Sequence, residues 1–403
     1  MTIPMRFQAF SIILLLFSAG GTPVQAQQKG SNARSKQAAN TVDFEKLKAQ
    51  AEAARDTDQI PEAIALYEKL VKLRPNWAEG WWHIGAMRYD RDDFVEAEKA
   101  FAKYVVLEPG IGSGWAMIGL CEYRNKKLVS SLQNLAKARK LGLGGNQELA
   151  RVVRYHEALL LIRGLQFEAA LKILEIFTLE HLESPAVLEA MGMAVLRIPE
   201  APENLKPEDR EIARQFGKAA FLGLEHKRSE SLQLYEQLEA AHRGKPNVAY
   251  AFGIALVSQG ENERAVEQFK KELEQDPKHV PAILQVALAD ISIRKFDEAL
   301  EFATKAVVLD PGNFAGYYAQ GRVYLYLNDL PHAIAMLEKA GSFAPNSGPV
   351  FYTLAQAYQR SNRPADAARA RAVFAKLEEN EKRKDETNPE PIEKPPGTGI
   401  PPH

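Results

Sequence analysis

Histidine and cysteine, the side chains that most often carry catalysis or bind metal, are scattered along this chain. The histidines are His83, His156, His181, His226, His242, His279, His332 and His403. None pairs with another histidine, a cysteine or a carboxylate at ligand spacing on one helix face. The single cysteine, Cys121, follows Gly119 and Leu120, with no neighbour in the sequence that would lower its pKa. We therefore expect structural or solvated histidines, a buried cysteine and no metal.

The glycine-rich segment 110–114 invites comparison with a phosphate-binding loop. Its sequence is Gly-Ile-Gly-Ser-Gly, which is not the G-x-G-x-x-G spacing, and no strand precedes it and no Walker lysine follows it. Aspartate and glutamate are abundant but fall on solvent faces at helical spacing, so nothing selects a catalytic pair. The formal net charge of -1 offers no basic stripe for nucleic acid. The sequence thus predicts a non-enzymatic protein with no cofactor.

A fixed period of 34 residues indicates how the side chains are positioned. Alanine recurs at Ala265, Ala299, Ala333 and Ala367, and proline at Pro277, Pro311 and Pro345. A period in this range marks a stacked repeat architecture, in which each repeat buries its apolar face only against its neighbours.

Each repeat is expected to hold two helices. One amphipathic segment starts at Trp81, a turn lies at residues 90–92, and a second segment starts at Phe94 and stops at Pro109. Counting from Phe314 as position 1, small residues fall at positions 8 and 20, where the two helices would cross at close range. A bulky side chain at either position would separate the helices.

The pattern resembles the tetratricopeptide repeat family over most of residues 43–380. The matching positions are Trp81, Gly85, Ala97, Phe101 and Pro109 in one copy, and Tyr317, Gly321, Tyr324, Ala333 and Pro345 in another. The resemblance implies an all-α fold, an α-α superhelix of about nine to ten helix-turn-helix repeats, some of them degenerate.

The first 26 residues have the features of a secretory signal. Arg6 supplies a positive charge, residues 9–19 are apolar except for Ser11 and Ser18, and Val24-Gln25-Ala26 resembles a cleavage site. We expect cleavage after Ala26 and export to the periplasm, the cell envelope or the medium, with an uncleaved N-terminal anchor as the alternative. No other apolar run approaches the roughly 20 residues that span a bilayer, so no transmembrane segment is expected after cleavage.

The remaining chain is expected to divide into five segments. These are a flexible linker (27–42), an N-terminal repeat array (43–182), an irregular segment (183–245), a C-terminal array (246–383) and a disordered proline-rich tail (384–403). In the irregular segment a helix over 185–197 lacks a clear partner, because the prolines of residues 198–204 cannot continue it. A pair is expected over 208–224 and 229–243. The irregularity is either a degenerate repeat or a break between two arrays.

The resemblance implies that positions 2, 5, 9, 12 and 13 of the first helices line a concave groove. The partner-binding residues implied are Trp82, Tyr89, Tyr123, Arg124, Tyr250, Leu284, Tyr318, Arg322, Tyr326, Tyr352, Gln356 and Arg360. Aromatic residues interspersed with arginine are typical of binding surfaces. Positions 5 and 9 lack the lysine and asparagine with which some relatives clamp a peptide carboxylate, which disfavours a chaperone of that type.

These observations favour an exported scaffold that binds a protein or peptide in this groove. One alternative is a ligand-binding or enzymatic site in the irregular segment, since loops on rigid scaffolds often carry function. Another is a self-associating structural protein. The polar last helix, with Asp366, Arg369 and Lys376, would cap the array, so we expect a monomer or weak dimer.

Overall fold

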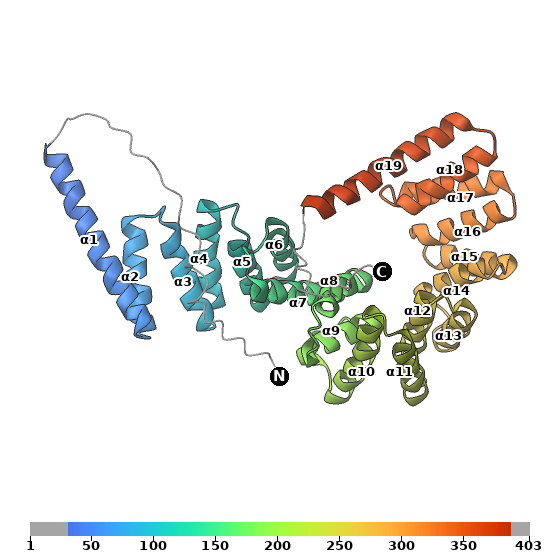
Figure 1. The fold of residues 1–403 in the computed structure, drawn as a ribbon, viewed down its shortest axis with the longest axis horizontal. Helices are drawn as coiled ribbons and strands as arrows, with labels where there is room; N and C mark the ends of the chain where they lie inside the picture. The colour runs from blue at the N-terminus through green and yellow to red at the C-terminus, as the bar shows by residue number, and fades with distance from the viewer. Residues whose placement is uncertain (1–30, 388–403) are drawn as a thin grey trace, which may run out of the picture. The chain divides into compact units, whose positions relative to one another are not determined.

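The computed structural model describes residues 31–387, and every regular element in that range is a helix (Figure 1). The expected signal peptide and residues 388–403 of the tail lie outside the described residues. The α-helices are α1 (Ser31–Asp56), α2 (Ile60–Leu73), α3 (Ala78–Asp90), α4 (Phe94–Leu107), α5 (Gly112–Arg124), α6 (Leu128–Leu141), α7 (Gln147–Arg163), α8 (Phe167–Leu179), α9 (Pro185–Val195), α10 (Pro207–Leu224), α11 (Arg228–Ala241), α12 (Val248–Ser258), α13 (Asn262–Gln275), α14 (Val280–Ser292), α15 (Phe296–Leu309), α16 (Phe314–Tyr326), α17 (Leu330–Phe343), α18 (Gly348–Arg360) and α19 (Pro364–Thr387).

Consecutive helices pack in antiparallel pairs, as the repeat predicts. Within residues 31–387 the pairs are α1 with α2, α3 with α4, α5 with α6, α7 with α8, α10 with α11, α12 with α13, α14 with α15, α16 with α17, and α18 with α19. Neighbouring pairs also pack against each other, through α2 and α3, α4 and α5, α6 and α7, α8 and α9, α11 and α12, α13 and α14, α15 and α16, and α17 and α18. The predicted fold class, a superhelix of tetratricopeptide repeats, is confirmed.

Close approach of the paired helices explains the small residues at position 8. A Cβ atom on Gly85 would lie 2.8 Å from the Phe101 ring, so only glycine allows α3 and α4 this separation. At the same position in other pairs, the carbonyls of Gly119 and Ala219 accept hydrogen bonds of 2.7 Å from the Ser131 and Ser231 hydroxyls. The second of these bonds confirms the pair expected over 208–224 and 229–243.

The turn between the two helices of a pair has one conformation throughout. After α3, Asp92 adopts φ 60° and the Asp93 amide bonds the Arg88 carbonyl at 2.9 Å, which ends the helix in a left-handed cap. Residues with positive φ follow the first helices at Asp58, Asp92, Lys126, Leu165, Arg197, His226, Gly260, Arg294, Asn328 and Asn362. Most of these residues are not glycine, so the turn is imposed by the packing of the pairs.

The chain divides into two compact units, unit 1 (residues 1–214) and unit 2 (residues 215–403). The division falls inside α10, within the segment expected to be irregular. In unit 1, α9 ends with the same turn as the first helices, since Arg197 has φ 54° and the Ile198 amide bonds the Met193 carbonyl at 2.8 Å. No second helix follows. A nine-residue segment, here termed the strap (residues 198–206), leads to α10 and contains one 3₁₀ turn, Pro202–Asn204.

Two expected boundaries need correction, and one finding bears on membranes. Helix α1 begins at Ser31, so most of the predicted linker 27–42 is helical, and α19 continues to Thr387, beyond the predicted start of the disordered tail. Among residues 31–387, no helix combines the length and the apolar character that crossing a membrane requires.

Candidate interaction site

Three of the predicted groove residues are buried and therefore unavailable to a partner. Trp82, Tyr250 and Leu284, all at position 5, expose 7%, 5% and 9% of their surface. The Trp82 ring meets Phe101 edge-on with centroids 5.4 Å apart, and Tyr250 lies 5.8 Å from Phe269. The prediction that these side chains line an open surface is wrong, because large rings on the second helices cover them.

Two further tyrosines, both at position 12 of unit 1, are half-buried. Tyr89 packs edge-on against Phe94 at 5.2 Å, and burial raises its pKa to about 12. Tyr123 meets the His156 ring at 4.8 Å, and burial likewise raises its pKa to about 12. The neighbouring Arg124 is exposed, with its guanidinium 4.8 Å from the Phe94 ring. Both tyrosines are therefore only partly accessible to a partner.

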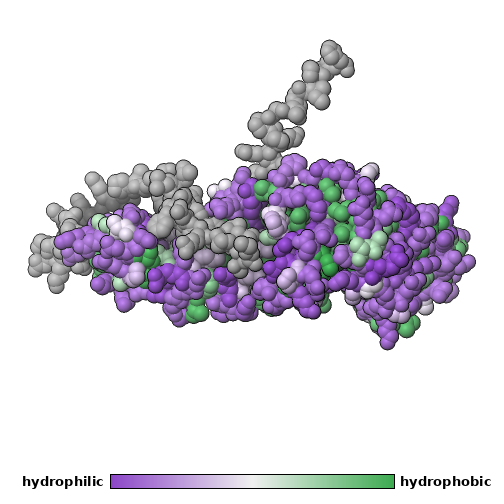
Figure 2. Space-filling model, turned by 90° about the horizontal axis from the view of Figure 1, so that it is seen from below, coloured by the Kyte–Doolittle hydropathy of each residue, from purple (hydrophilic) through white to green (hydrophobic). Residues whose placement is uncertain are grey.

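The remaining predicted residues lie in α16 and α18 of unit 2, and their side chains reach solvent. We define them as the C-terminal aromatic surface: Tyr318, Arg322, Tyr326, Tyr352, Gln356 and Arg360. Tyr326 and Tyr352 are 54% and 52% exposed. Gln356 and Arg360 are exposed, and Tyr318 and Arg322 are half-buried. Figure 2 shows a largely hydrophilic exterior with small hydrophobic areas.

Neighbouring side chains hold the C-terminal aromatic surface in place. The Tyr326 ring stacks on Phe296 at 5.3 Å, and Tyr352 lies 5.4 Å from Phe374 of α19. Arg360 donates to the Leu325 carbonyl at 2.6 Å and to Asn328 Oδ1 at 2.7 Å, which links α18 to the end of α16. Rings supported on one face and open on the other lose little conformational entropy when they bind.

Two position-5 residues of unit 1 were missed by sequence analysis. With Ala158 and Gly192 taken as position 8, position 5 falls on Tyr155 and Glu189. The 39-residue step from Gly119 to Ala158 hid this register. Glu189 is buried and ion-paired, with Oε1 3.2 Å from Arg210 Nε and Oε2 2.9 Å from Arg214 Nη2. Because two arginines neutralise this carboxylate, it holds α10 against α9.

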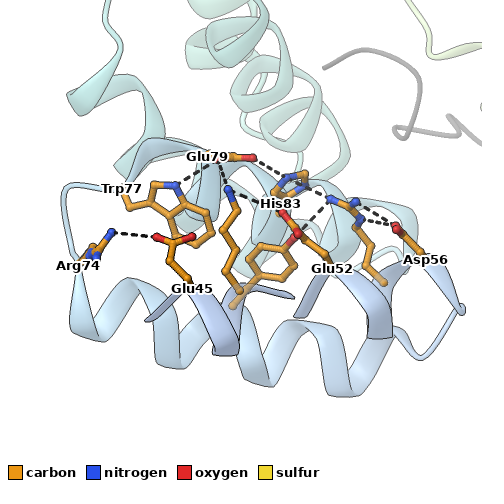
Figure 3. A network of polar contacts seen from close by, with 10 residues as sticks. Glu45, Glu52, Asp56, Arg74, Trp77, Glu79 and His83 are labelled. Carbon is orange, nitrogen blue, oxygen red and sulfur yellow. Dashed lines mark hydrogen bonds and ion pairs between the residues drawn. The ribbon is translucent and has the colours of Figure 1, made fainter. Parts of the chain in front are cut away.

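A polar network at position 2 of the pair formed by α3 and α4 was also missed (Figure 3). Glu79 of α3 accepts hydrogen bonds from Lys48 Nζ at 3.3 Å and Trp77 Nε1 at 3.2 Å, and its Oε1 lies 3.7 Å from His83 Nε2. The His83 contact, together with Lys48, lowers the pKa of Glu79 to about 2 although partial burial opposes the shift. Arg55 of α1 reaches the Tyr67 hydroxyl and the His83 ring, both at 3.3 Å. The network joins α1, α2 and α3.

The groups with reactive potential do not converge. Cys121 is fully buried, as expected, and burial raises the pKa of its thiol, so it packs as a small apolar side chain. In the glycine-rich segment, Gly110 belongs to the turn that precedes α5, and Gly112 and Gly114 lie in the first turn of that helix. Between residues 31 and 387, no group of three or more His, Cys, Asp or Glu side chains is arranged to hold a metal ion.

Comparison with known proteins agrees with the repeat. Residues 48–113 and 250–314 match the tetratricopeptide repeat family. The peptidyl-prolyl cis-trans isomerase FKBP4 of Mus musculus is 27% identical over 158 residues, which cover 36% of this chain and 34% of that protein. The chain thus spans about a third of the curated relative it matches.

Solved structures similar to part of this chain carry MamA in their titles. MamA 41-end from Desulfovibrio magneticus RS-1 is 23% identical, covering 43% of this chain and 97% of its own, with a TM-score of 0.38. A MamA double mutant, RS-1 ArsTM, is 22% identical with the same coverages and a TM-score of 0.39. MamA AMB-1 is 25% identical, covering 41% and 98%, with a TM-score of 0.36.

Proposed function

We propose that this chain, a tetratricopeptide-repeat scaffold for protein–protein interaction, binds an extended segment of its partner on the C-terminal aromatic surface. One observation carries the proposal. Among the aromatic residues of the predicted groove, Trp82 and Tyr250 are buried and three tyrosines are half-buried, whereas Tyr326 and Tyr352 expose more than half of their surface. Exposed rings beside arginine are the side chains that most often dominate binding energy, because they desolvate a large area at low entropic cost.

The proposed binding mode follows from the chemistry of this surface. Arg322 lies 5.7 Å from the Tyr318 ring, and Gln356 is exposed on the next first helix. Such a row offers apolar faces for the partner's side chains and hydrogen-bond donors for its backbone carbonyls. An extended peptide uses both, whereas a compact ligand would use one. The scaffold needs no catalytic group for this function, and we propose that it is non-enzymatic.

Partner capture by a doubly substituted chain tests the proposal. Tyr326→Ala with Tyr352→Ala is expected to reduce partner capture from an envelope extract at least tenfold, since an aromatic hot spot contributes about 2 kcal/mol or more. Val308→Ala is the matched control, because Val308 is a large apolar residue of the same unit, 72% exposed, on the second helix α15. Equal capture by both variants would place the binding site elsewhere.

We further propose that the chain is exported and acts in the periplasm or cell envelope. The motif carried by residues 6–26 supports this proposal. Fractionation of cells followed by N-terminal sequencing tests it, and a mature chain that begins at Gln27 is the expected result. A membrane-bound chain that retains Arg6 would instead identify an uncleaved anchor.

Between the alternatives to a partner-binding scaffold, the self-associating protein is the easier to test. Asp366 of α19 forms an ion pair with Arg363 at 2.6 Å and another with Arg369. A charged last helix opposes end-to-end stacking, which supports a monomer or weak dimer. Light scattering at several concentrations distinguishes a monomer or weak dimer from a stable oligomer. An oligomer whose size does not change with concentration would contradict the proposal.

A further inference from the structure

The strap of unit 1 follows α9 at the point in the chain where a second helix would begin. The turn after α9 is the one that elsewhere leads into the second helix of a pair, and Arg197 adopts its left-handed conformation. Pro199 and Pro202 then follow. Because proline lacks an amide proton and clashes with the preceding turn, these residues prevent helix formation. Unit 1 therefore contains a first helix followed by an extended segment of its own chain.

The strap is anchored at its centre and exposed elsewhere. Ala201 is 1% exposed, and Arg210 donates a hydrogen bond to the Pro202 carbonyl. Ile198 and Leu205 are half-buried. By contrast, Pro199, Glu200, Glu203 and Asn204 are exposed. Because Ala201 is the one buried residue of the strap, the segment buries little apolar area and is held only weakly.

The strap lies against side chains of the first helices. Glu203 Oε1 is 3.5 Å from Lys126 Nζ in the turn after α5. Burial is the main cause of the raised pKa values of the Tyr123 and Tyr155 hydroxyls, and the negative charge of Glu203 raises them further. Tyr123 and Tyr155 occupy positions 12 and 5, and both rings meet His156, at centroid distances of 4.8 and 5.4 Å. Residues of the predicted groove in unit 1 are thus beside the strap.

We propose that the strap is a built-in ligand of unit 1, and that an extended acidic peptide of a partner binds beside Tyr123, Lys126 and Tyr155 by displacing it. The inference rests on the proposed scaffold function only for the premise that first-helix faces take peptides. It concerns unit 1, whereas the proposed binding surface lies on unit 2.

Charge indicates the class of peptide. Exposed cations gather where α5 and α7 end: Arg124 and Lys126 after α5, and Arg163 at the end of α7, close enough to lower the pKa of Tyr123 in opposition to burial. The strap presents a carboxylate to this cluster. A competing peptide would need an acidic residue at the same place, and proline would favour its extended form.

The strap is held weakly enough for a partner peptide to displace it. The Lys126 and Glu203 side chains are 73% and 50% exposed, and ion pairs this exposed contribute little to stability because solvent screens them. The intramolecular strap still has the advantage of high effective concentration. A free peptide should therefore bind weakly to the native chain and tightly once the strap is released.

A fluorescent peptide with the sequence of residues 198–206 is the probe for the full chain. Ala201→Glu, which places a charge at the buried anchor, is expected to raise its affinity at least tenfold and to increase hydrogen exchange in the strap. Adding Lys126→Glu should then lower the affinity at least fivefold. Where Ala201→Glu fails to fold, Glu203→Lys replaces it with an expected gain of three- to fivefold, and Glu200→Lys is the matched control.

Two results would overturn the proposal. One is a released chain that folds, by circular dichroism, and binds no peptide. The other is a released chain that dimerises in light scattering and takes up no peptide, since a second copy would then be the occupant. Neither result bears on the variants at Tyr326 and Tyr352, so failure here and failure of the proposed function are distinguishable.

Discussion

A methyl group on Gly192 would overlap the backbone carbonyl oxygen of Ala213. In the regular repeats, position 8 faces a side chain of the second helix, as Gly85 faces Phe101. At α9 it faces the backbone of α10 instead. The helix that follows the strap therefore covers α9 at the place that a second helix would otherwise take, and it does so at closer range.

Gly192→Ala should destabilise unit 1 more than Gly85→Ala destabilises it. A backbone carbonyl cannot rotate away as the Phe101 ring can, so the helices must separate, at a cost of about 3 kcal/mol or more. Chemical denaturation followed by circular dichroism measures the difference. Similar midpoints for the two variants would mean that α9 and α10 tolerate separation.

Asp290 is a buried carboxyl group whose removal should stabilise unit 2. It is 0% exposed, and neither carboxylate oxygen has a hydrogen-bond partner. Burial raises its pKa, although Lys270 and Lys295 oppose the shift. Asp290→Asn is expected to add about 1–2 kcal/mol at pH 7, because an uncharged amide is cheaper to bury.

The pH dependence supplies the control for Asp290. Because its folded pKa exceeds its unfolded pKa, folding takes up a proton, and native stability should rise as pH falls through the folded value towards the unfolded one. Asp290→Asn should remove this rise. If the stability of Asp290→Asn depends on pH in the same way as that of the wild type, the carboxylate is solvated in solution.

Glu79 should have the opposite pH dependence. Its pKa falls from an ordinary value of 4.5 to about 2 in the folded chain, so its contribution is present above pH 4.5 and is lost as pH falls towards 2. Glu79→Gln should weaken the packing of α1 on α3 at neutral pH and flatten acid unfolding in this window. Urea titrations at pH 7 and pH 3 measure both effects, and Glu62→Gln, an exposed change on α2, is the control.

Glu272 of α13 caps the first turn of the neighbouring helix α12. Its carboxylate accepts from the Asn247 amide at 2.8 Å and the Tyr250 amide at 3.2 Å, at the start of α12, and the side chain is 1% exposed. Glu272→Ala should cost about 2 kcal/mol, since two buried amides lose their acceptor. Faster hydrogen exchange confined to the first turn of α12 is the expected signature; unchanged exchange there would contradict the capping role.

The repeat geometry could be predicted because it depends on residues close in sequence. Trp81 and Trp115 each donate to the carbonyl of the proline six residues earlier, at 2.8 and 2.9 Å, and Gly85 meets Phe101 across one turn. Such short spacings can be recognised directly in the amino-acid sequence. The register of Tyr155 and Glu189 escaped prediction because five extra residues precede them, and the role of Glu189 depends on its contacts with α10.

The sequence by itself determined the architecture, since a 34-residue period of small, aromatic and proline residues admits one way of packing helix pairs. Only the tertiary structure decided which groove residues remain accessible. Tyr250 and Tyr352 occupy the same position in their repeats, yet Phe269 and His279 enclose one while the other is 52% exposed. Exposure depends on the side chains of neighbouring repeats, and the period does not specify those.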